Sequence, residues 1–238
     1  MPATCIVVMP AFNEEACIGE VCREWLTMLE GVPGSRLLVV NDGSTDRTAK
    51  ILDALAQGSP ALTVVHQGNA GHGAAILHGY HKALEMGCEW VCQVDSDGQF
   101  EARDFAELWA RARHCRFVLG YRRRRRDPLH RRALSAALRV LILVLFGAHI
   151  RDPNVPFRLM EARYLDELLA RVPATAFAPN VFLSILARRC GRDFCEVQVA
   201  HASRRAGAGS LGMWRLLRLL PRCVKELLGF RSRLCRKD

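Results

Sequence analysis

Residues 1–120 alternate between short apolar runs and longer segments whose apolar residues recur every three or four positions. Short runs favour buried β-strands, and the wider spacing predicts amphipathic helices. One helix is expected with an apolar stripe over 17–29 and Asn13 as its N-cap, so that its first turn contains Glu14 and Glu15. A second helix, running to about Ala56, is expected to be capped by Ser44 or Thr45. The order β-α-β-α predicts an α/β fold with a largely parallel sheet covered by helices. We expect strands at 5–9, 37–40, 62–65, 90–94 and 116–119.

Polar clusters follow three of these strands, at residues 10–14, 41–46 and 95–99. Ligands of open parallel sheets bind at the carboxyl ends of the strands, so the clusters predict one shared site. A glycine-rich segment, 68–73, follows the third strand. It is compatible with close approach of the backbone to a ligand and equally with an ordinary strand-to-helix turn. Neither a GxGxxG fingerprint nor a P-loop is present.

The segment Asp-Ser-Asp-Gly-Gln at 95–99 is the most informative of the three clusters. Alternate residues of an extended chain share one face, so Asp95, Asp97 and Gln99 can converge. Carboxylate and amide oxygens suit Mg²⁺ or Mn²⁺, often together with the phosphates of a substrate. The same residue types are also typical of a turn after a strand. Its position beside the other two clusters favours the metal site.

The net charge of +10 is concentrated in two segments of a chain that is 50% hydrophobic. Residues 122–139 contain eight arginines and one aspartate, and residues 201–238 contain ten lysines and arginines against two carboxylates. Because half the residues are hydrophobic, the chain can bury a full core and global disorder is not expected. Its length of 238 residues suits one large domain, or a domain plus an appendage. The basic character therefore belongs to local surfaces in the second half of the chain.

Two apolar segments could lie against a membrane or against the core. Within 133–150 the uninterrupted stretch 140–148 is nine residues long, too short for about 30 Å of hydrocarbon. It predicts either a packed core helix or an interfacial helix with arginines toward lipid headgroups. From Leu211 onward, an apolar stripe and a basic face with Trp214 favour a membrane-surface helix, with packing on the domain as the alternative. Pro221 is expected to kink that helix.

The ten cysteines include no CxxC pair. Most of them stand singly inside apolar stretches, which is typical of buried reduced thiols in a cytosolic protein. A signal-peptide pattern is also missing before the first apolar run at 5–9. We therefore expect a cytoplasmic location, peripheral on the cytoplasmic face of the membrane.

Seven motifs together resemble the family 2 glycosyltransferases of the GT-A fold. The closest branch is the dolichol- or polyprenyl-phosphate hexosyltransferases, of the dolichol-phosphate mannose synthase type. The resemblance implies a Rossmann-like, mostly parallel sheet in a GT-A domain over 1–210, with a nucleotide-sugar half (1–120) and an acceptor half (121–210), and a basic amphipathic tail over 211–238. The motifs are VVMPAFNEE (7–15), VVNDGSTDRT (39–48), GNAGHGAA (68–75), QVDSDGQF (93–100), VLGYR (118–122), DPNVPFRLM (152–160) and HASRRAGAGSL (201–211).

The resemblance also implies roles for individual residues. The divalent cation, Mg²⁺ or Mn²⁺, would bridge the donor diphosphate and be held by Asp97, Gln99 and Asp95. A late RxxGxS loop would close over the donor phosphates through Arg204 and, less surely, Arg205. This chain lacks the Lys that often follows the Ser of that loop. The residues implied in donor binding are Pro10, Phe12, Glu14, Asp42, Asp95 and Arg204.

The acceptor side is implied to be rich in arginine. Arg122 and the pair Arg131 and Ser135 correspond to the family's residues around the acceptor phosphate, with Arg132 as a register alternative. Arginine forks suit phosphate oxygens. Arg158 matches a position near the reaction centre. The residues implied in catalysis are thus Asp97, Arg122 and Arg158.

The chain has no QxxRW segment, the mark of family members that carry a later carboxylate as general base. A phosphate is already ionised at neutral pH and needs no base, whereas a sugar hydroxyl does. The expected function is therefore an inverting, metal-dependent transfer of a hexose from a UDP- or GDP-linked sugar to polyprenyl phosphate, dolichyl or undecaprenyl, at the cytoplasmic membrane face. A separate membrane-protein partner is compatible with this function.

Two other functions are weighed against it. One is a GT-A glycosyltransferase that acts on a soluble saccharide or another hydroxyl acceptor. The other is a non-catalytic nucleic-acid-binding module, suggested by the arginine-rich segments. Those segments lack interleaved aromatic residues, and the acidic cluster would repel phosphates in the absence of a metal, so we expect no nucleic-acid partner.

Overall fold

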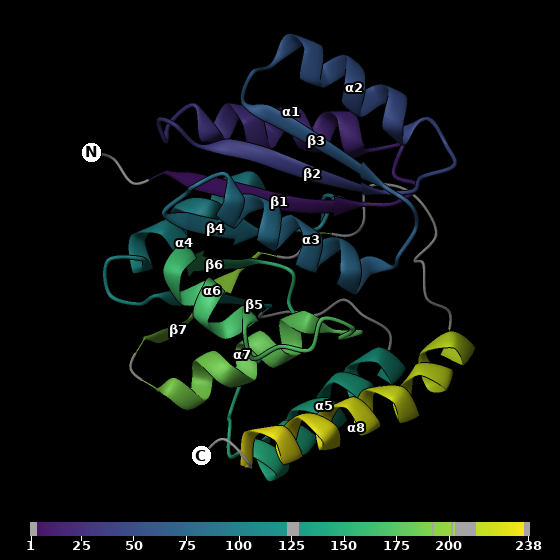
Figure 1. Cartoon of the computed structure of the whole chain (residues 1–238), viewed down its shortest axis with the longest axis vertical. Coiled ribbons are helices and arrows are strands. Elements are labelled where there is room, and N and C mark those ends of the chain that lie inside the picture. Colours follow the sequence, from purple (N-terminus) through teal and green to yellow (C-terminus); the bar gives the residue numbers. More distant parts are fainter. Residues whose placement is uncertain (1–3, 123–128, 192, 201, 203–212, 236–238) are drawn as a thin grey trace.

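The structure is a computed structural model that describes residues 4–122, 129–191, 193–200, 202 and 213–235, without side chains at 129–133, 213–220 and 235. Seven strands and eight α-helices are described, with one short 3₁₀ helix, η1 (Figure 1). The elements are β1 (Cys5–Ala11), α1 (Ile18–Leu29), β2 (Arg36–Asp42), α2 (Thr48–Gly58), β3 (Leu62–Gln67), α3 (His72–Glu85), β4 (Trp90–Gln93), η1 (Ala102–Asp104), α4 (Phe105–Arg111), β5 (Phe117–Arg122), α5 (Leu129–Phe146), β6 (Arg158–Glu161), α6 (Ala162–Leu169), α7 (Pro179–Cys190), β7 (Phe194–Val199) and α8 (Met213–Cys235).

The strands form one sheet in the order β3-β2-β1-β4-β6-β5-β7. Strand β6 runs antiparallel to β4 and β5, and the other pairs are parallel. The α/β fold with a mostly parallel sheet is therefore confirmed. The reversal of β6 places its first residue, Arg158, opposite Gln93 and Leu119, near the carboxyl ends of β4 and β5.

The expected strands are confirmed, and four of them, β1, β2, β3 and β5, continue further at their carboxyl ends. β1 extends through Pro10 to Ala11, paired there only with β2, because its pairing with β4 ends at Val8. Pro10 therefore removes no hydrogen bond from the β1–β4 ladder. Since β2 also continues to Asp42, residues of the first two polar clusters begin inside the strands rather than after them.

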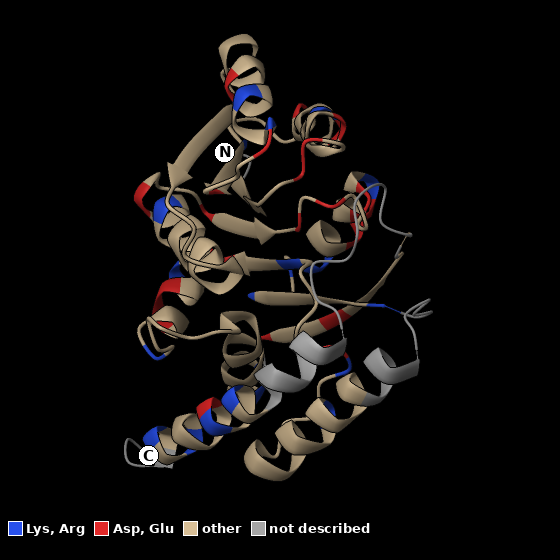
Figure 2. Ribbon diagram, turned by 90° about the vertical axis from the view of Figure 1, so that its right-hand side faces the viewer, with Lys and Arg blue, Asp and Glu red and all other residues tan. Residues whose placement is uncertain are grey.

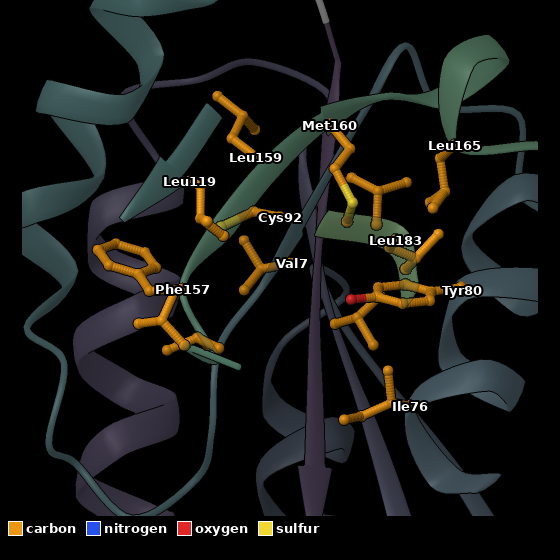
Figure 3. Close-up of a cluster of buried hydrophobic side chains, with 14 of the residues drawn as sticks. Val7, Ile76, Tyr80, Cys92, Leu119, Phe157, Leu159, Met160, Leu165 and Leu183 are labelled. Atoms are coloured by element: carbon orange, nitrogen blue, oxygen red, sulfur yellow. The ribbon is translucent and has the colours of Figure 1, made fainter. Parts of the chain in front are cut away.

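Hydrophobic side chains cover both faces of the sheet. Figure 3 shows Val7 and Phe157 on the side of α1, and Tyr80 and Leu183 on the opposite side. Helix α3 packs closely on the second face, where a Cβ added at Gly79 would come within 2.4 Å of a Val8 methyl group. Successive side chains of a strand point to opposite faces, so buried central strands have apolar residues throughout.

The expected N-cap of α1 is wrong. The helix begins at Ile18, and Asn13 adopts a left-handed backbone conformation with φ of 53°. The Asn13 side-chain oxygen accepts the backbone N–H of Thr45 at 2.8 Å, and its own N–H donates to the Ser44 hydroxyl at 3.0 Å. Asn13 thus joins the loops after β1 and β2, and a long-range contact displaces the local cap.

The expected caps of α2 are wrong for a similar reason. The helix begins at Thr48, so the residue at its N-cap position is Arg47 and not Ser44 or Thr45. The Asp46 carboxylate accepts the Thr48 N–H at 2.9 Å and so satisfies one free donor of the first turn. Ser44 and Thr45 instead contact the loop after β1, which draws the two loops together.

Helices α5 and α8 lie side by side at one end of the molecule (Figure 1). The second half of α8 buries Leu227, Phe230 and Leu234, and the Phe230 ring lies 4.6 Å from Phe182 and 6.0 Å from Phe146 between centroids. The second half of α8 therefore packs on the domain, which was the alternative to a membrane-surface helix. No helix in the described part of the chain is long and apolar enough to cross a membrane.

One pair of cysteines departs from the expectation of reduced thiols. Cys115 and Cys195 form a disulfide with a Cα–Cα distance of 5.9 Å across a sequence separation of 80 residues. The parallel pairing of β5 with β7 places the two cysteines close together. Other described cysteines, Cys5, Cys22 and Cys92 among them, are buried free thiols.

Candidate active site

The candidate site lies at the edge of the sheet where the parallel strands end. Strands β1, β2, β4 and β5 contribute their carboxyl ends there, and the antiparallel β6 contributes its start. The predicted clusters at 10–14, 41–46 and 95–99 are thus brought to one edge, together with Arg122 and Arg158. This is the edge at which doubly wound sheets bind ligands.

Asp95 stands two residues beyond the end of β4. Its Oδ1 accepts a hydrogen bond from Gln93 Nε2 at 3.2 Å and lies 3.7 Å from His72 Nε2. Burial raises the pKa of the Asp95 carboxyl to about 6; His72 lowers this pKa and Asp97 raises it further. A cation beside these carboxylates would favour their ionised forms.

Asp97 and Gln99 form the turn that follows. The Asp97 Oδ1 accepts the Gln99 backbone N–H at 3.1 Å, with Gly98 between them at a φ of 69°. Two hydrogen bonds join Gln99 to Ala202. The Gln99 carbonyl accepts the Ala202 N–H at 3.0 Å, and Gln99 Nε2 donates to the Ala202 carbonyl at 3.4 Å. The chain after β7 thus passes beside the acidic segment. Arg204, the predicted clamp residue, and Arg205 are outside the described residues.

The donor set of this segment fits a hard divalent cation. In each of the two carboxylates, Asp95 and Asp97, Oδ1 accepts a hydrogen bond from the described residues and Oδ2 does not. Each carboxylate therefore keeps a second oxygen for a ligand. No group of three or more His, Cys, Asp or Glu suited to a metal occurs among the described residues. Two carboxylates and one carboxamide are oxygen donors of the kind that Mg²⁺ takes alongside substrate phosphates.

The first cluster combines buried and exposed residues. Pro10 is buried in β1, and Phe12 exposes its ring at the edge of the site. Glu14 is buried, its backbone N–H donates to Thr48 Oγ1 at 2.9 Å, and its carboxylate lies 3.4 Å from the Cys17 thiol. These contacts fix the loop that carries Phe12.

Asp42 shapes the glycine-rich loop. Its carboxylate accepts hydrogen bonds from Gln67 Nε2 at 2.7 Å, from the Ala70 N–H at 2.8 Å and from the Gly71 N–H at 2.9 Å. The next residue, Gly43, has a φ of 69°, and a Cβ there would come 2.5 Å from the Asn69 nitrogen. In this structure Asp42 acts on the site through the loop that it folds.

Arg122 ends β5 in a bidentate ion pair. Its Nε and Nη2 donate to the two carboxylate oxygens of Asp152 at 2.7 and 3.1 Å. The side chains are 16% and 4% exposed, so the guanidinium is fixed in direction. Ser135 lies half-buried on α5, and the Arg131 side chain is outside the described residues.

Arg158 is fully buried at the start of β6. It donates to the carbonyls of Val155 and Asn180, the latter at 2.9 Å, and to Ser184 Oγ at 3.2 Å. Its Nε is buried with no hydrogen-bond partner among the described residues. Because its side chain has no exposed surface, Arg158 acts on the site only through the residues that it contacts and through its charge.

Sequence reasoning missed four residues around this site. Asp152 and Gln93 stood inside the recognised motifs, and Gln93 shares a strand face with Asp95, which was an available signal. His72 stood in the glycine-rich motif at the start of α3. Asn180 had no local signal, because its side-chain partners Tyr80 and Gln93 lie 100 and 87 positions away in the sequence.

The fold is an α/β domain whose acidic segment, Arg122 and Arg158 lie at one edge of the sheet, and comparison with known proteins identifies its family. Residues 6–169 match the family described as Glycosyl transferase family 2. The chain belongs to glycosyl transferase family 2.

Two curated relatives carry the same name, undecaprenyl-phosphate 4-deoxy-4-formamido-L-arabinose transferase. The protein of Pseudomonas aeruginosa (strain LESB58) is 32% identical over 218 residues, which is 90% of this chain and 62% of the relative. The protein of Salmonella choleraesuis (strain SC-B67) is 27% identical, covering 90% of this chain and 64% of the relative. The chain thus spans less than two thirds of the length of these relatives.

A solved structure shares the fold. Glucosyl-3-phosphoglycerate synthase from Mycobacterium tuberculosis, in complex with Mn²⁺, UDP-glucose and phosphoglyceric acid, superimposes with a TM-score of 0.74. The match covers 97% of this chain and 80% of that protein at 22% identity. At this identity the likeness establishes the architecture alone.

Proposed function

We propose that this chain transfers a sugar from a nucleotide diphosphate sugar to polyprenyl phosphate, with a divalent cation on the donor side and inversion at the anomeric carbon. Membership of glycosyl transferase family 2 supports the reaction class. The relatives named as undecaprenyl-phosphate transferases support the lipid acceptor. Their named sugar is an arabinose derivative, so the proposal covers sugars of pentose and hexose size.

The observation that carries the proposal is that the acidic segment and Arg122 follow or end two strands, β4 and β5, that flank β6 at the same edge of the sheet. Strand order β4-β6-β5 places Asp95 and Arg122 two strand spacings apart, roughly 10 Å. Asp95, Asp97 and Gln99 suit the cation of the donor diphosphate, and the positive charge of the Arg122 guanidinium, held in direction by Asp152, suits the phosphate of the acceptor. Two phosphate groups can therefore be held on either side of one sugar.

The chemistry needs few steps from the protein. An oxygen of the acceptor phosphate forms a bond to the anomeric carbon while the bond from that carbon to the donor diphosphate breaks, and the nucleoside diphosphate leaves. The acceptor is already an anion, so no general base is required. When bound, a divalent cation would stabilise the charge on the leaving diphosphate. Arg122, directed by Asp152, would orient the acceptor phosphate.

A lipid acceptor requires contact with the membrane, and α5 offers a surface for it. Val140, Leu143 and Val144 are exposed there, at 60%, 45% and 70%. Figure 2 shows α5 mostly uncharged, beside an α8 with Lys and Arg along it. Among the residues of α8 whose side chains the structure describes, Arg222, Lys225, Arg231 and Arg233 are exposed. Exposed apolar side chains beside basic ones suit the anionic surface of the cytoplasmic leaflet.

A donor and acceptor screen tests the proposal. The purified chain is incubated with Mn²⁺, undecaprenyl phosphate and labelled UDP-, GDP- or dTDP-sugars, and the organic phase is analysed for a lipid-linked sugar. Formation of that product with one donor supports the proposal. Transfer only to a soluble saccharide or phosphorylated acceptor would support the alternative enzyme, and no transfer to any acceptor would contradict both.

A further inference from the structure

A continuous chain of buried polar side chains runs from α3 to the acidic segment. The Tyr80 hydroxyl donates to Asn180 Oδ1 at 2.9 Å, Asn180 Nδ2 donates to Gln93 Oε1 at 3.0 Å, and Gln93 Nε2 donates to Asp95 Oδ1 at 3.2 Å. Tyr80 and Gln93 have no exposed surface, and Asn180 is 3% exposed. We name Tyr80, Asn180 and Gln93 the polar relay.

The direction of the relay follows from its last acceptor. An ionised carboxylate only accepts hydrogen bonds, so Gln93 must present its NH₂ group to Asp95 and its oxygen to Asn180. Asn180 must then present its own NH₂ group to Gln93, which leaves its oxygen for the Tyr80 hydroxyl. Burial raises the pKa of that hydroxyl, so the donor proton is retained. Each link therefore has one orientation.

The relay is held rigidly from several sides. The Tyr80 ring packs within the hydrophobic cluster of Ile76 and Leu183 (Figure 3). The Asn180 carbonyl accepts hydrogen bonds from Arg158 Nη1 at 2.9 Å and from Ser184 Oγ at 2.8 Å. A fully satisfied buried network fixes one geometry, whereas an unpaired member would cost free energy.

We propose that the polar relay positions the Asp95 carboxylate for the divalent cation of the donor complex. This inference rests on the proposed function. Gln93 donates to Oδ1 of Asp95 and so holds the carboxylate in one orientation, in which Oδ2 would remain available to a cation. The relay ends on a side chain that remains 26% exposed at the candidate site. A network that served only the core would have no need to end there.

The test compares two tyrosine-to-phenylalanine variants of the whole chain. Tyr80→Phe removes the first donor of the relay. Tyr164→Phe is the matched control, because Tyr164 is a buried tyrosine on α6 whose hydroxyl has no hydrogen-bond partner among the described residues. The dissociation constant of Mn²⁺ is measured from the electron paramagnetic resonance signal of the free ion, with UDP or GDP present. Thermal unfolding of each variant is recorded alongside.

Tyr80→Phe is expected to weaken Mn²⁺ binding by about threefold to tenfold, and Gln93→Met, at the residue that bonds Asp95, by about 10- to 100-fold. Tyr164→Phe should bind as the parent does. In the Gln93→Met background, Tyr80→Phe should add no further loss, because the relay is already interrupted.

Unchanged binding in Tyr80→Phe would overturn the relay and leave the proposed function standing. An equal loss in Tyr164→Phe, or a full additional loss in the Gln93→Met background, would also overturn it. A parent chain that binds no Mn²⁺ with either nucleotide would contradict the metal assignment of the proposed function and the relay with it.

Discussion

Individual residues of the site divide into those that shape loops and those that remain available to ligands. Asp42 accepts three hydrogen bonds from the protein itself, whereas Asp97 accepts only one within the described residues. Both had been assigned to ligands from the motifs. We therefore predict that replacement of Asp42 affects stability more than replacement of Asp97 does.

Asp42→Ala is expected to destabilise the fold. It would leave the N–H groups of Ala70 and Gly71 and the Gln67 amide without an acceptor, at a cost of about 1–3 kcal/mol for each group that stays buried. Urea unfolding followed by circular dichroism measures the loss. Asp97→Ala is the matched control and should change the free energy of unfolding by less than about 0.5 kcal/mol. Equal losses in the two variants would contradict the division of roles.

Arg122→Lys is expected to impair the acceptor side while keeping the charge. Lysine cannot form the bidentate contact with Asp152 that fixes the direction of the guanidinium. We expect kcat/KM for polyprenyl phosphate to fall by about tenfold or more, with little change in the KM of the sugar donor. Arg139→Lys, at an exposed position on α5, is the control. A selective rise in the donor KM would contradict the assignment.

Among the elements, five of the seven described strands were predicted from the sequence, whereas β6 and β7 were not. β1 to β5 follow from local apolar runs, and their parallel order places the polar clusters at one edge. The four-residue β6 begins with the buried Arg158 and has no apolar run or alternation that predicts a strand. The start of α1 was also misplaced, because Asn13 bonds a residue 32 positions away. Local patterns specify elements, whereas long-range contacts decide their ends and pairings.

Helix α5 gives a prediction at the same scale. Val144→Asp places a charge in the exposed apolar surface and should reduce flotation with phosphatidylglycerol vesicles by about tenfold, because burying a charge at the interface is costly. Ala54→Asp is the matched control, on an exposed position of α2 at the opposite end of the molecule (Figure 1). Equal flotation of the two variants would show that α5 is not the docking surface.

At the scale of the whole molecule, the disulfide joins β7 to the turn before β5. Reduction of a bridge across 80 residues is expected to cost about 2–4 kcal/mol. Dithiothreitol should therefore lower the thermal midpoint of the parent, and it should leave Cys115→Ser unchanged. The two midpoints are compared by circular dichroism. A parent that is insensitive to dithiothreitol after full reduction, verified by thiol counting, would contradict a stabilising bridge.

The central claim is that the acidic segment holds the donor side of a sugar transfer to a lipid phosphate. The direct measurement is the rate of labelled sugar transfer to undecaprenyl phosphate by the parent and by Asp97→Ala. The parent should lose activity with EDTA and regain it with Mn²⁺, while Asp97→Ala should lose at least about 100-fold in rate, since a group that stabilises the leaving charge contributes several kcal/mol. Metal-independent transfer by the parent, or a folded Asp97→Ala as active as the parent, would contradict the account.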